Sequence, residues 1–191
     1  MDRGANFINL DIIDQSPIET ERLVLRRYTL LDINDVFTYA SDSEVTKYLL
    51  WDAHKDLEDS KNFLNWIESV NCTERGKIFF VYAIQLKSEN KVIGSIDFKN
   101  THKFAGQIDY VIGQKYWGRG YMTEAAQAIK NWAFRDLPEL VRLQAYCLPE
   151  NLGSRRVMEK VGMEYEGLRK KSLIVKNKPA DLVHYAYIKE T

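Results

Sequence analysis

The sequence of 191 residues contains only two cysteines and three histidines, and these shortages exclude several kinds of site. Cys72 and Cys147 can form one pair at most, which is no disulfide framework, so we expect free thiols and a reducing, cytoplasmic setting. His54, His102 and His184 are far apart in the sequence and lack the spacing of metal ligands, so we predict no bound metal. A Gly-x-Ser-x-Gly nucleophile motif is absent as well.

Excess charge and long apolar runs are also missing. The 27 basic and 27 acidic residues cancel, which favours neither a nucleic-acid partner nor a membrane surface. No apolar run reaches the length of a membrane span, and residues 1–6 lack the apolar core of a signal peptide. With 45% hydrophobic residues the chain can bury one core, so we expect a single domain over 21–191 after a loose lead-in over 1–20.

The sequence alternates between strand-like and helix-like segments without repeats. Period-two patterns predict strands over 22–28, 78–86, 92–98, 107–112, 141–147, 168–175 and 182–188. Helical spacing predicts helices over 31–41, 57–70, 122–136 and 154–160. We expect Asp32 and Thr123 to be helix N-caps, and Leu57 and Trp66 to lie on the buried face of the second helix. The predicted order is β-α-α-β-β-β-α-β-α-β-β, an α/β (α+β) domain.

The most informative stretch is 116–125, which reads YWGRGYMTEA between a predicted strand and a predicted helix. Gly118 and Gly120 permit positive φ and a close ligand, and the first N–H groups of the helix attract phosphate. It is no P-loop, because Arg119-Gly120 stand where Lys-Ser/Thr are needed. It is no dinucleotide loop, because Thr123 replaces the third glycine. A diphosphate cradle of another kind remains, with an ordinary tight turn as the alternative.

Two further motifs follow in order, PENLGS at 149–154 and EKVGM at 159–163, the second followed by EGLR at 166–169. With the glycine loop they make the chain resemble the GNAT (GCN5-related) acyltransferase family over most of its length. Within that family it is most similar to the RimJ/RimL-like branch of ribosomal-protein N-terminal acetyltransferases. The resemblance implies a mostly antiparallel, twisted mixed sheet of about seven strands, splayed between the fourth and fifth, with about four helices.

The resemblance also implies acetyl-CoA as co-substrate, held by three groups of residues. These are Trp117, Gly118, Arg119, Gly120, Tyr121, Met122 and Thr123 around the pyrophosphate; Val111, Ile112, Asn151 and Ser154 along the pantetheine arm; and Arg156, with Arg155, near the outer phosphate. From spacing alone, Asn151 and Ser154 are equally suited to capping the helix that follows them. For Arg155 and Arg156, the residues alone favour a solvated helix face over a phosphate contact.

The chain departs from the family pattern at three positions. Trp117 and Met122 replace the first and last residues of the wider loop pattern, which should matter little because backbone grips the phosphate. Met158 stands where many members carry a tyrosine that protonates the departing CoA thiolate, and methionine has no proton to donate. That duty falls to Ser154, to water or to no group at all, since a thiol with a pKa of about 8.5 is a tolerable leaving group.

The acceptor amine must lose its proton before it attacks. At pH 7 this costs a lysine-like amine of pKa about 10.4 roughly 4.6 kcal/mol, but an α-amine of pKa about 8 only about 1.4 kcal/mol. A weak base therefore suffices for an N-terminal acceptor, and the candidates are Asp109 and Glu150. Asp109 is equally well explained as a solvent-facing strand residue. Tyr110 and Tyr146 are predicted to pack, and Cys147 to lie in the core with an acetyl-cysteine relay as a minor alternative.

Charge distribution gives a further hint about the acceptor. Eight acidic residues lie between Asp32 and Asp59, and eight basic ones between Arg155 and Lys178, which suits a cationic amine meeting an anionic cofactor. Helix caps explain part of this asymmetry. We predict an acetyl-CoA-dependent N-acetyltransferase for a peptide N-terminal α-amine, as in ribosomal-protein acetylation. A small-molecule amine acetyltransferase and a non-catalytic CoA-binding protein are the alternatives, and a homodimer is possible.

Overall fold

The computed structural model describes residues 16–71 and 77–190 and has thirteen helices and strands besides short 3-10 turns. The strands are β1 (Ile18–Glu19), β2 (Leu23–Arg26), β3 (Phe79–Leu86), β4 (Lys91–His102), β5 (Ala105–Ile112), β6 (Arg142–Cys147), β7 (Glu164–Val175) and β8 (Lys178–Ile188). The helices are α1 (Ile33–Ala40), α2 (Ser43–Thr46), α3 (Leu57–Val70), α4 (Tyr121–Asp136) and α5 (Leu152–Lys160).

All strands join one eight-stranded sheet in the order β1-β2-β3-β4-β5-β6-β8-β7. Every neighbouring pair is antiparallel except β5 and β6, which are parallel. These two strands pair only where Ala105–Gln107 face Arg142–Gln144, although β5 continues to Ile112 and β6 to Cys147. The sheet therefore splays between the fourth and fifth predicted strands. The predicted fold class is confirmed.

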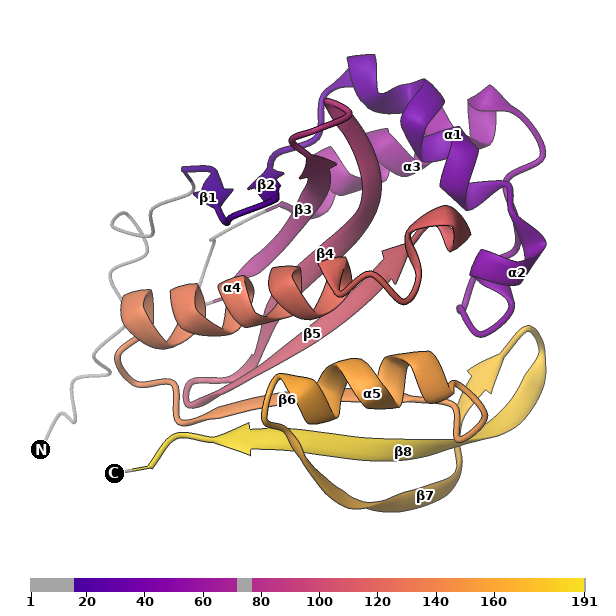
Figure 1. The fold of residues 1–191 in the computed structure, drawn as a ribbon. Helices are drawn as coiled ribbons and strands as arrows, with labels where there is room; N and C mark the ends of the chain where they lie inside the picture. The colour runs from indigo at the N-terminus through magenta and orange to yellow at the C-terminus, as the bar shows by residue number, and fades with distance from the viewer. Residues whose placement is uncertain (1–15, 72–76, 191) are drawn as a thin grey trace, which may run out of the picture.

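The helices cover the sheet on both faces (Figure 1). The larger core lies under α4 and α5, where Trp132 packs edge-on against Phe80, Tyr82 and Phe98. A smaller core, which includes Val36 and other residues of α1, α3, β3 and β4, fills the opposite face. The apolar spacing of each helix thus buries one stripe against the sheet.

Two short elements extend the predicted fold. Ile18–Glu19 form β1 and pair with β2, so the expected lead-in ends before residue 18, and its first fifteen residues lie outside the described part. α2 begins at the N-cap Asp42, whose carboxylate accepts a hydrogen bond from the Glu44 N–H at 2.9 Å. Neither segment is long enough to show a hydrophobic period, which is why the sequence analysis predicted seven strands and four helices.

The two predicted N-caps behave differently from expectation. Thr123 was predicted to cap α4, but the helix begins at Tyr121 and its N-cap is Gly120, so Thr123 lies inside the first turn. Asp32 does occupy the N-cap position of α1, although its side chain makes no capping bond. Its carboxylate instead receives two hydrogen bonds from Arg26, both at 2.8 Å.

The predicted buried face of α3 was partly wrong. The bounds Leu57–Val70 are as expected, and Leu64 and Ile67 are buried, but Leu57 and Trp66 are 44% and 45% exposed. Leu57 lies in the first turn, immediately after the N-cap Asp56. Trp66 lies on the flank of the helix, where its ring packs against Phe63 and Phe79.

Two expectations concern membranes and thiols. Within residues 16–71 and 77–190, no helix is both long and apolar enough to cross a bilayer. Cys147 is a free, buried thiol, and Cys72 lies outside the described residues.

Candidate functional site

A cavity of about 570 Å³ opens between the N-terminal end of α4, the end of β5, α5 and α2. Every residue predicted to bind the cofactor lines it except Arg119 and Arg155. The candidate catalytic residues Ser154 and Glu150 also line it, whereas Asp109 does not. Among the lining residues that were not predicted to belong to the site are Glu44, Tyr48, Tyr110 and Lys160.

The glycine loop forms one end of this cavity. Gly118 and Gly120 have φ of 73° and 81°, which only glycine adopts without strain. A side chain at Gly118 would enter open space, so the loop leaves room for a group to lie against its backbone. The first intrahelical bond of α4 is donated by the Glu124 N–H to the Gly120 carbonyl, which leaves the preceding N–H groups without helical partners. This cradle fits a pyrophosphate.

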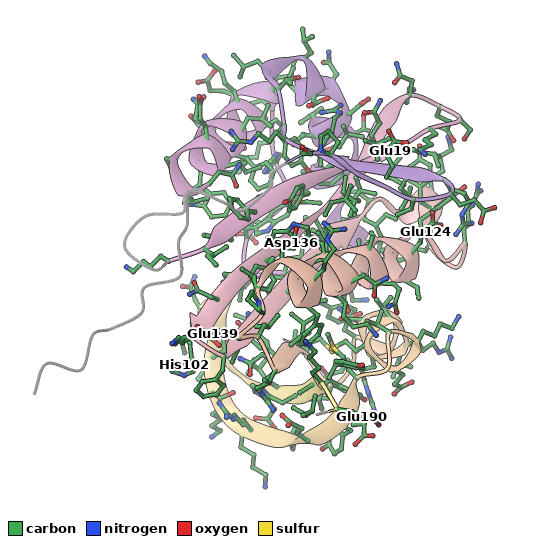
Figure 2. The ribbon with its side chains drawn as sticks, turned by 90° about the vertical axis from the view of Figure 1, so that its left-hand side faces the viewer. Glu19, His102, Glu124, Asp136, Glu139 and Glu190 are labelled. Atoms are coloured by element: carbon green, nitrogen blue, oxygen red, sulfur yellow. The ribbon has the colours of Figure 1, made fainter. Side chains whose placement is uncertain are left out.

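A clamp from the β1–β2 hairpin holds the loop in place. The Glu124 carboxylate accepts hydrogen bonds from the Thr20 hydroxyl at 2.6 Å and from the Arg22 backbone and Nε at 2.9 and 2.7 Å. Arg22 also donates to the Arg119 carbonyl at 3.0 Å and stacks over the Tyr121 ring at 4.5 Å. In Figure 2, Glu124 marks the end of α4 beside this hairpin, and Asp136 marks the other end. No sequence pattern indicated the clamp, because its two halves, Arg22 and Glu124, are 102 residues apart.

The splay exposes one edge of β5 to the cavity. Val111 and Ile112 pair with Ser95 and Gly94 of β4 on one side, and on the other side they lie beyond the three paired residues of β6. An extended amide chain can add to such an edge. The indole Nε1 of Trp117 donates to the Ile112 carbonyl at 2.8 Å, so this side chain ties the loop to the end of β5.

Asn151 and Ser154 meet at the start of α5, where both line the cavity. The Ser154 N–H donates to Asn151 Oδ1 at 3.1 Å, so the capping alternative is realised. The cap uses the oxygen of the Asn151 amide, and its nitrogen remains available as a donor. The Ser154 hydroxyl lies 2.9 Å from the hydroxyl of Tyr110. Tyr110 does pack in the core as predicted, but its polar end reaches the cavity wall.

Two sulfur-containing residues lie behind this wall. Met158 is buried, at 1% exposure, and belongs to the main core rather than to the cavity lining. The Cys147 thiol is also buried and donates to the Asn151 carbonyl, with 3.8 Å between Sγ and the oxygen. Burial raises the pKa of Cys147 to about 11, so at neutral pH the group is a thiol rather than a nucleophilic thiolate.

The basic residues of α5 separate into two groups. Arg156 and Lys160 line the cavity, one helical turn apart. Arg155 instead donates through Nε to the Tyr185 hydroxyl at 3.2 Å, outside the lining. Arg156 and Lys160 therefore supply the positive charge near the cavity, and Arg155 does not.

Asp109 belongs to a polar cluster on the sheet face opposite α4. Its carboxylate receives hydrogen bonds from Lys99 Nζ at 2.6 Å and Gln107 Nε2 at 2.9 Å. Asp97 pairs with it across β4 and β5, and Asp97 Oδ1 is buried with no hydrogen-bond partner in the described part of the chain. Burial and then the charge of Asp109 raise the pKa of Asp97 well above its usual value. Asp109 is thus the salt-bridge partner of Lys99, and burial favours the protonated form of Asp97.

Of the eight acidic residues between Asp32 and Asp59, Glu44 alone lines the cavity. Several of the other acids have structural roles: Asp42 and Asp56 are N-caps, Asp32 pairs with Arg26, Asp35 accepts from Val92 and Asp59 from Lys55. The charge asymmetry of the sequence is therefore a weak guide to the acceptor end. Across residues 16–71 and 77–190, no group of three or more His, Cys, Asp or Glu residues is arranged to hold a metal.

Comparison with known proteins gives three kinds of match. Residues 22–164 match the family model of the Acetyltransferase (GNAT) domain. YnaD of Bacillus subtilis (strain 168), an uncharacterized N-acetyltransferase, is 36% identical over 174 residues, which are 91% of this chain and 97% of YnaD.

Two solved structures resemble the whole chain. The crystal structure of a GNAT-family acetyltransferase from Bacillus anthracis has a TM-score of 0.80 at 35% identity and covers 92% of this chain and 99% of that one. The ribosomal L7/L12 alpha-N-protein acetyltransferase RimL, in complex with coenzyme A, has a TM-score of 0.76 at 20% identity over 91% and 98% of the two chains. The second likeness concerns the fold alone.

Proposed function

Because this chain belongs to the GNAT acetyltransferase family and is an N-acetyltransferase, we propose that it transfers acetyl from acetyl-CoA to the N-terminal α-amine of a peptide. The observation that carries the proposal is the continuous cavity from the glycine loop along the free edge of β5 to Ser154. We expect direct attack of the amine on the thioester without a covalent enzyme intermediate, since the buried Cys147 stays protonated. We further expect a cytoplasmic protein, and a homodimer stays a prediction.

The chain's own groups divide the binding of acetyl-CoA among them. Backbone N–H groups from Gly118 to Thr123 receive the pyrophosphate, helped by the positive end of α4. The edge of β5 at Val111 and Ile112 receives the pantetheine amides, and Asn151 supplies an amide donor. Arg156 neutralises the outer phosphate. When bound, acetyl-CoA supplies the activated acetyl group.

Two groups handle charge during the transfer. Ser154 donates a hydrogen bond toward the sulfur as negative charge develops there. Glu150 takes the amine proton, because it lines the cavity, whereas Asp109 is held by Lys99 and could reach the amine only through water. The weak basicity of either carboxylate suits an α-amine better than a lysine side chain.

The rival substrate is a small-molecule amine such as a polyamine, an amino acid or an antibiotic. The end of the cavity near α2 carries Glu44 and Tyr48, a carboxylate and an aromatic ring that suit the cationic groups of either class. We prefer the peptide as substrate because its α-amine has a lower pKa than a lysine-like amine and therefore loses its proton at a smaller free-energy cost. A CoA-binding protein without catalysis is disfavoured by the acetyltransferase relatives.

The experiment follows release of free thiol from acetyl-CoA with matched panels of short peptides and small amines. Peptides with a free N-terminus should turn over, and the same peptides with a blocked N-terminus but a free lysine should not. Turnover with small amines alone would favour the rival substrate. Tight CoA binding without turnover on either panel would contradict the proposal.

A further inference from the structure

The charged residues of α5 form two stripes along the helix. Arg155 and Glu159 are four residues apart and make the first stripe, and Arg156 and Lys160 make the second with the same spacing. The first stripe carries opposite charges and lies outside the cavity lining, whereas the second carries two positive charges and lines the cavity. The sequence of α5 thus separates a neutral stripe from a doubly positive one.

The neutral stripe is held by the sheet. Arg155 Nε donates to the Tyr185 hydroxyl at 3.2 Å, and the same hydroxyl donates to Glu159 Oε1 at 3.1 Å. Tyr185 is a buried residue of β8, so it fixes both side chains of the stripe. The one acidic residue of α5 is therefore held outside the cavity.

The positive stripe has no comparable contacts. Within the part of the chain that the structure describes, neither Arg156 nor Lys160 has a hydrogen bond or an ion pair, and both are exposed. Like charges four residues apart on a helix repel each other. Lys160 does not serve the end of the helix, because Lys130 Nζ donates to the carbonyl of the C-cap Val161 at 2.6 Å. An anion between the two side chains would relieve their repulsion.

The other walls of the cavity indicate which anion this is. Acetyl-CoA carries a pyrophosphate and, on its ribose, a phosphate monoester. The glycine loop meets the pyrophosphate with neutral backbone N–H groups, which leaves the monoester without a partner. A phosphate monoester carries nearly two negative charges at neutral pH, so two cations match it. Among the described residues that line the cavity, Arg156 and Lys160 are the basic ones.

We propose that Arg156 and Lys160 together bind the ribose phosphate of CoA, and that this pair makes the protein select CoA over dephospho-CoA, which lacks that phosphate. The proposal rests on the proposed function, because the co-substrate comes from there, and it adds Lys160 to the site. The guanidinium of Arg156 can present two parallel N–H donors to a phosphate, and Lys160 adds a point charge from the next turn. The loop accepts any diphosphate through its backbone, whereas the stripe recognises this one group.

The acidic residues of the cavity support the same orientation. Glu44 lies on α2 and Glu150 lies just before α5, so both carboxylates are at the start of α5 or across from it. Lys160 is the last residue of α5, six residues after Ser154, which is about 9 Å along the helix axis. A phosphate is repelled by the carboxylates and attracted by the positive stripe. Substitution of Lys160 should therefore leave the reaction end of the cavity intact.

The test measures the affinities of CoA and dephospho-CoA by calorimetry. The wild-type protein should bind CoA about 100-fold more tightly, and Lys160→Ala and Arg156→Ala should each reduce this preference about 10-fold by weakening CoA alone. Lys160→Arg should keep the preference, since it keeps the charge. Arg155→Ala is the matched control and should also keep it, because it removes the same charge from the same helix outside the cavity.

Three results would overturn the proposal: equal affinity of the wild-type protein for both ligands, an equal loss for both in Lys160→Ala, or the same fall in preference in Arg155→Ala. The last would assign the effect to net charge. The measurement needs no turnover, so it is independent of the acceptor. A protein that preferred CoA but acetylated no peptide would keep the ribose-phosphate site and contradict the proposed function, whereas peptide turnover without a preference between the two ligands would do the reverse.

Discussion

The two ends of the cavity use different parts of the chain. At the loop end, the groups that meet a ligand are backbone N–H groups, set by two positive-φ glycines and the first turn of α4. At the other end, side chains of β5, the PENLGS segment and α2 converge from three separate parts of the chain. The loop end is built from one continuous segment of the chain, whereas the reaction end is assembled from distant segments that the folded sheet brings together.

This difference decides how each end tolerates substitution. The loop end should be insensitive to side chains but sensitive to φ, since any residue supplies an N–H and only glycine supplies the conformation. The reaction end should respond to the loss of single atoms, since Ser154, Tyr110 and Asn151 each present one polar group. The comparison would be wrong if loop-end variants responded to the loss of a side chain, or if reaction-end variants did not.

The largest effect is expected for Gly120→Val. A β-branched residue resists a φ of 81°, so the N–H groups behind it turn away from the phosphate. CoA affinity measured by calorimetry should fall about 100-fold or more, with the circular dichroism spectrum unchanged. Gly153→Ala is the control, because its added carbon meets nothing closer than Asn151 Oδ1 at 3.7 Å. Equal affinity in both variants would refute a backbone cradle.

The next effect separates the two candidate bases. Glu150→Gln should lower turnover about 10- to 100-fold near neutral pH, and the defect should shrink as pH rises, because the α-amine then loses its proton unaided. Asp109→Asn should have a smaller effect, since Asp109 lies outside the cavity lining and is paired with Lys99. The measurement is thiol release from pH 6 to 9. A steeper loss in Asp109→Asn than in Glu150→Gln would reverse the assignment.

The same contrast between local and long-range contacts explains which parts of the structure could be predicted from the sequence. The glycine loop, α4 and the order of the elements follow from glycine chemistry and hydrophobic periods that act over a few residues. The prediction of Thr123 as N-cap was wrong. Threonine is a preferred N-cap residue, but here the left-handed Gly120 already occupies the N-cap position of α4. Local pattern thus predicted the backbone end of the cavity.

Side-chain contacts at long range left no comparable signal. Tyr110 and Ser154 are 44 residues apart, and Arg22 and Glu124 are 102 apart. An alternating strand pattern places Tyr110 on the core face but does not say that its hydroxyl finds a partner there. The pairing of Asp109 with Lys99 was missed for the same reason, because it requires the register of β4 and β5. These side-chain pairs can be identified only from the three-dimensional structure, because hydrophobic periodicity carries no information about contacts between distant segments.

A third, smaller effect tests the double role of Asn151. Asn151→Asp keeps an oxygen for the Ser154 N–H but removes the amide donor, whereas Asn151→Ala removes both. Asn151→Asp should retain the free energy of unfolding and weaken acetyl-CoA binding about 10-fold. Asn151→Ala should do the same and also lose about 1 kcal/mol of stability. Wild-type affinity in Asn151→Asp would leave the residue as a cap alone.

The smallest effect is expected for the clamp by which the β1–β2 hairpin holds the loop end. Burial opposes ionisation of Glu124, but hydrogen bonds from Thr20 and Arg22 outweigh it and hold the pKa of Glu124 below its usual value. A carboxylate with a lowered folded-state pKa stabilises the protein above its unfolded pKa of about 4.3, and this contribution disappears as pH falls through the folded value.

Arg22→Ala should therefore lower the free energy of unfolding by about 1 kcal/mol at pH 7, and the difference from wild type should vanish below about pH 4. CoA affinity should fall only about threefold, because the glycines still set the loop. Urea unfolding at both pH values measures the first effect and calorimetry the second. Lys87→Ala is the matched control, since it removes an exposed ion pair with Glu19 in the same hairpin. If Arg22→Ala abolished CoA binding, the loop would depend on a side chain as much as the reaction end does, and the two regions would not differ as argued.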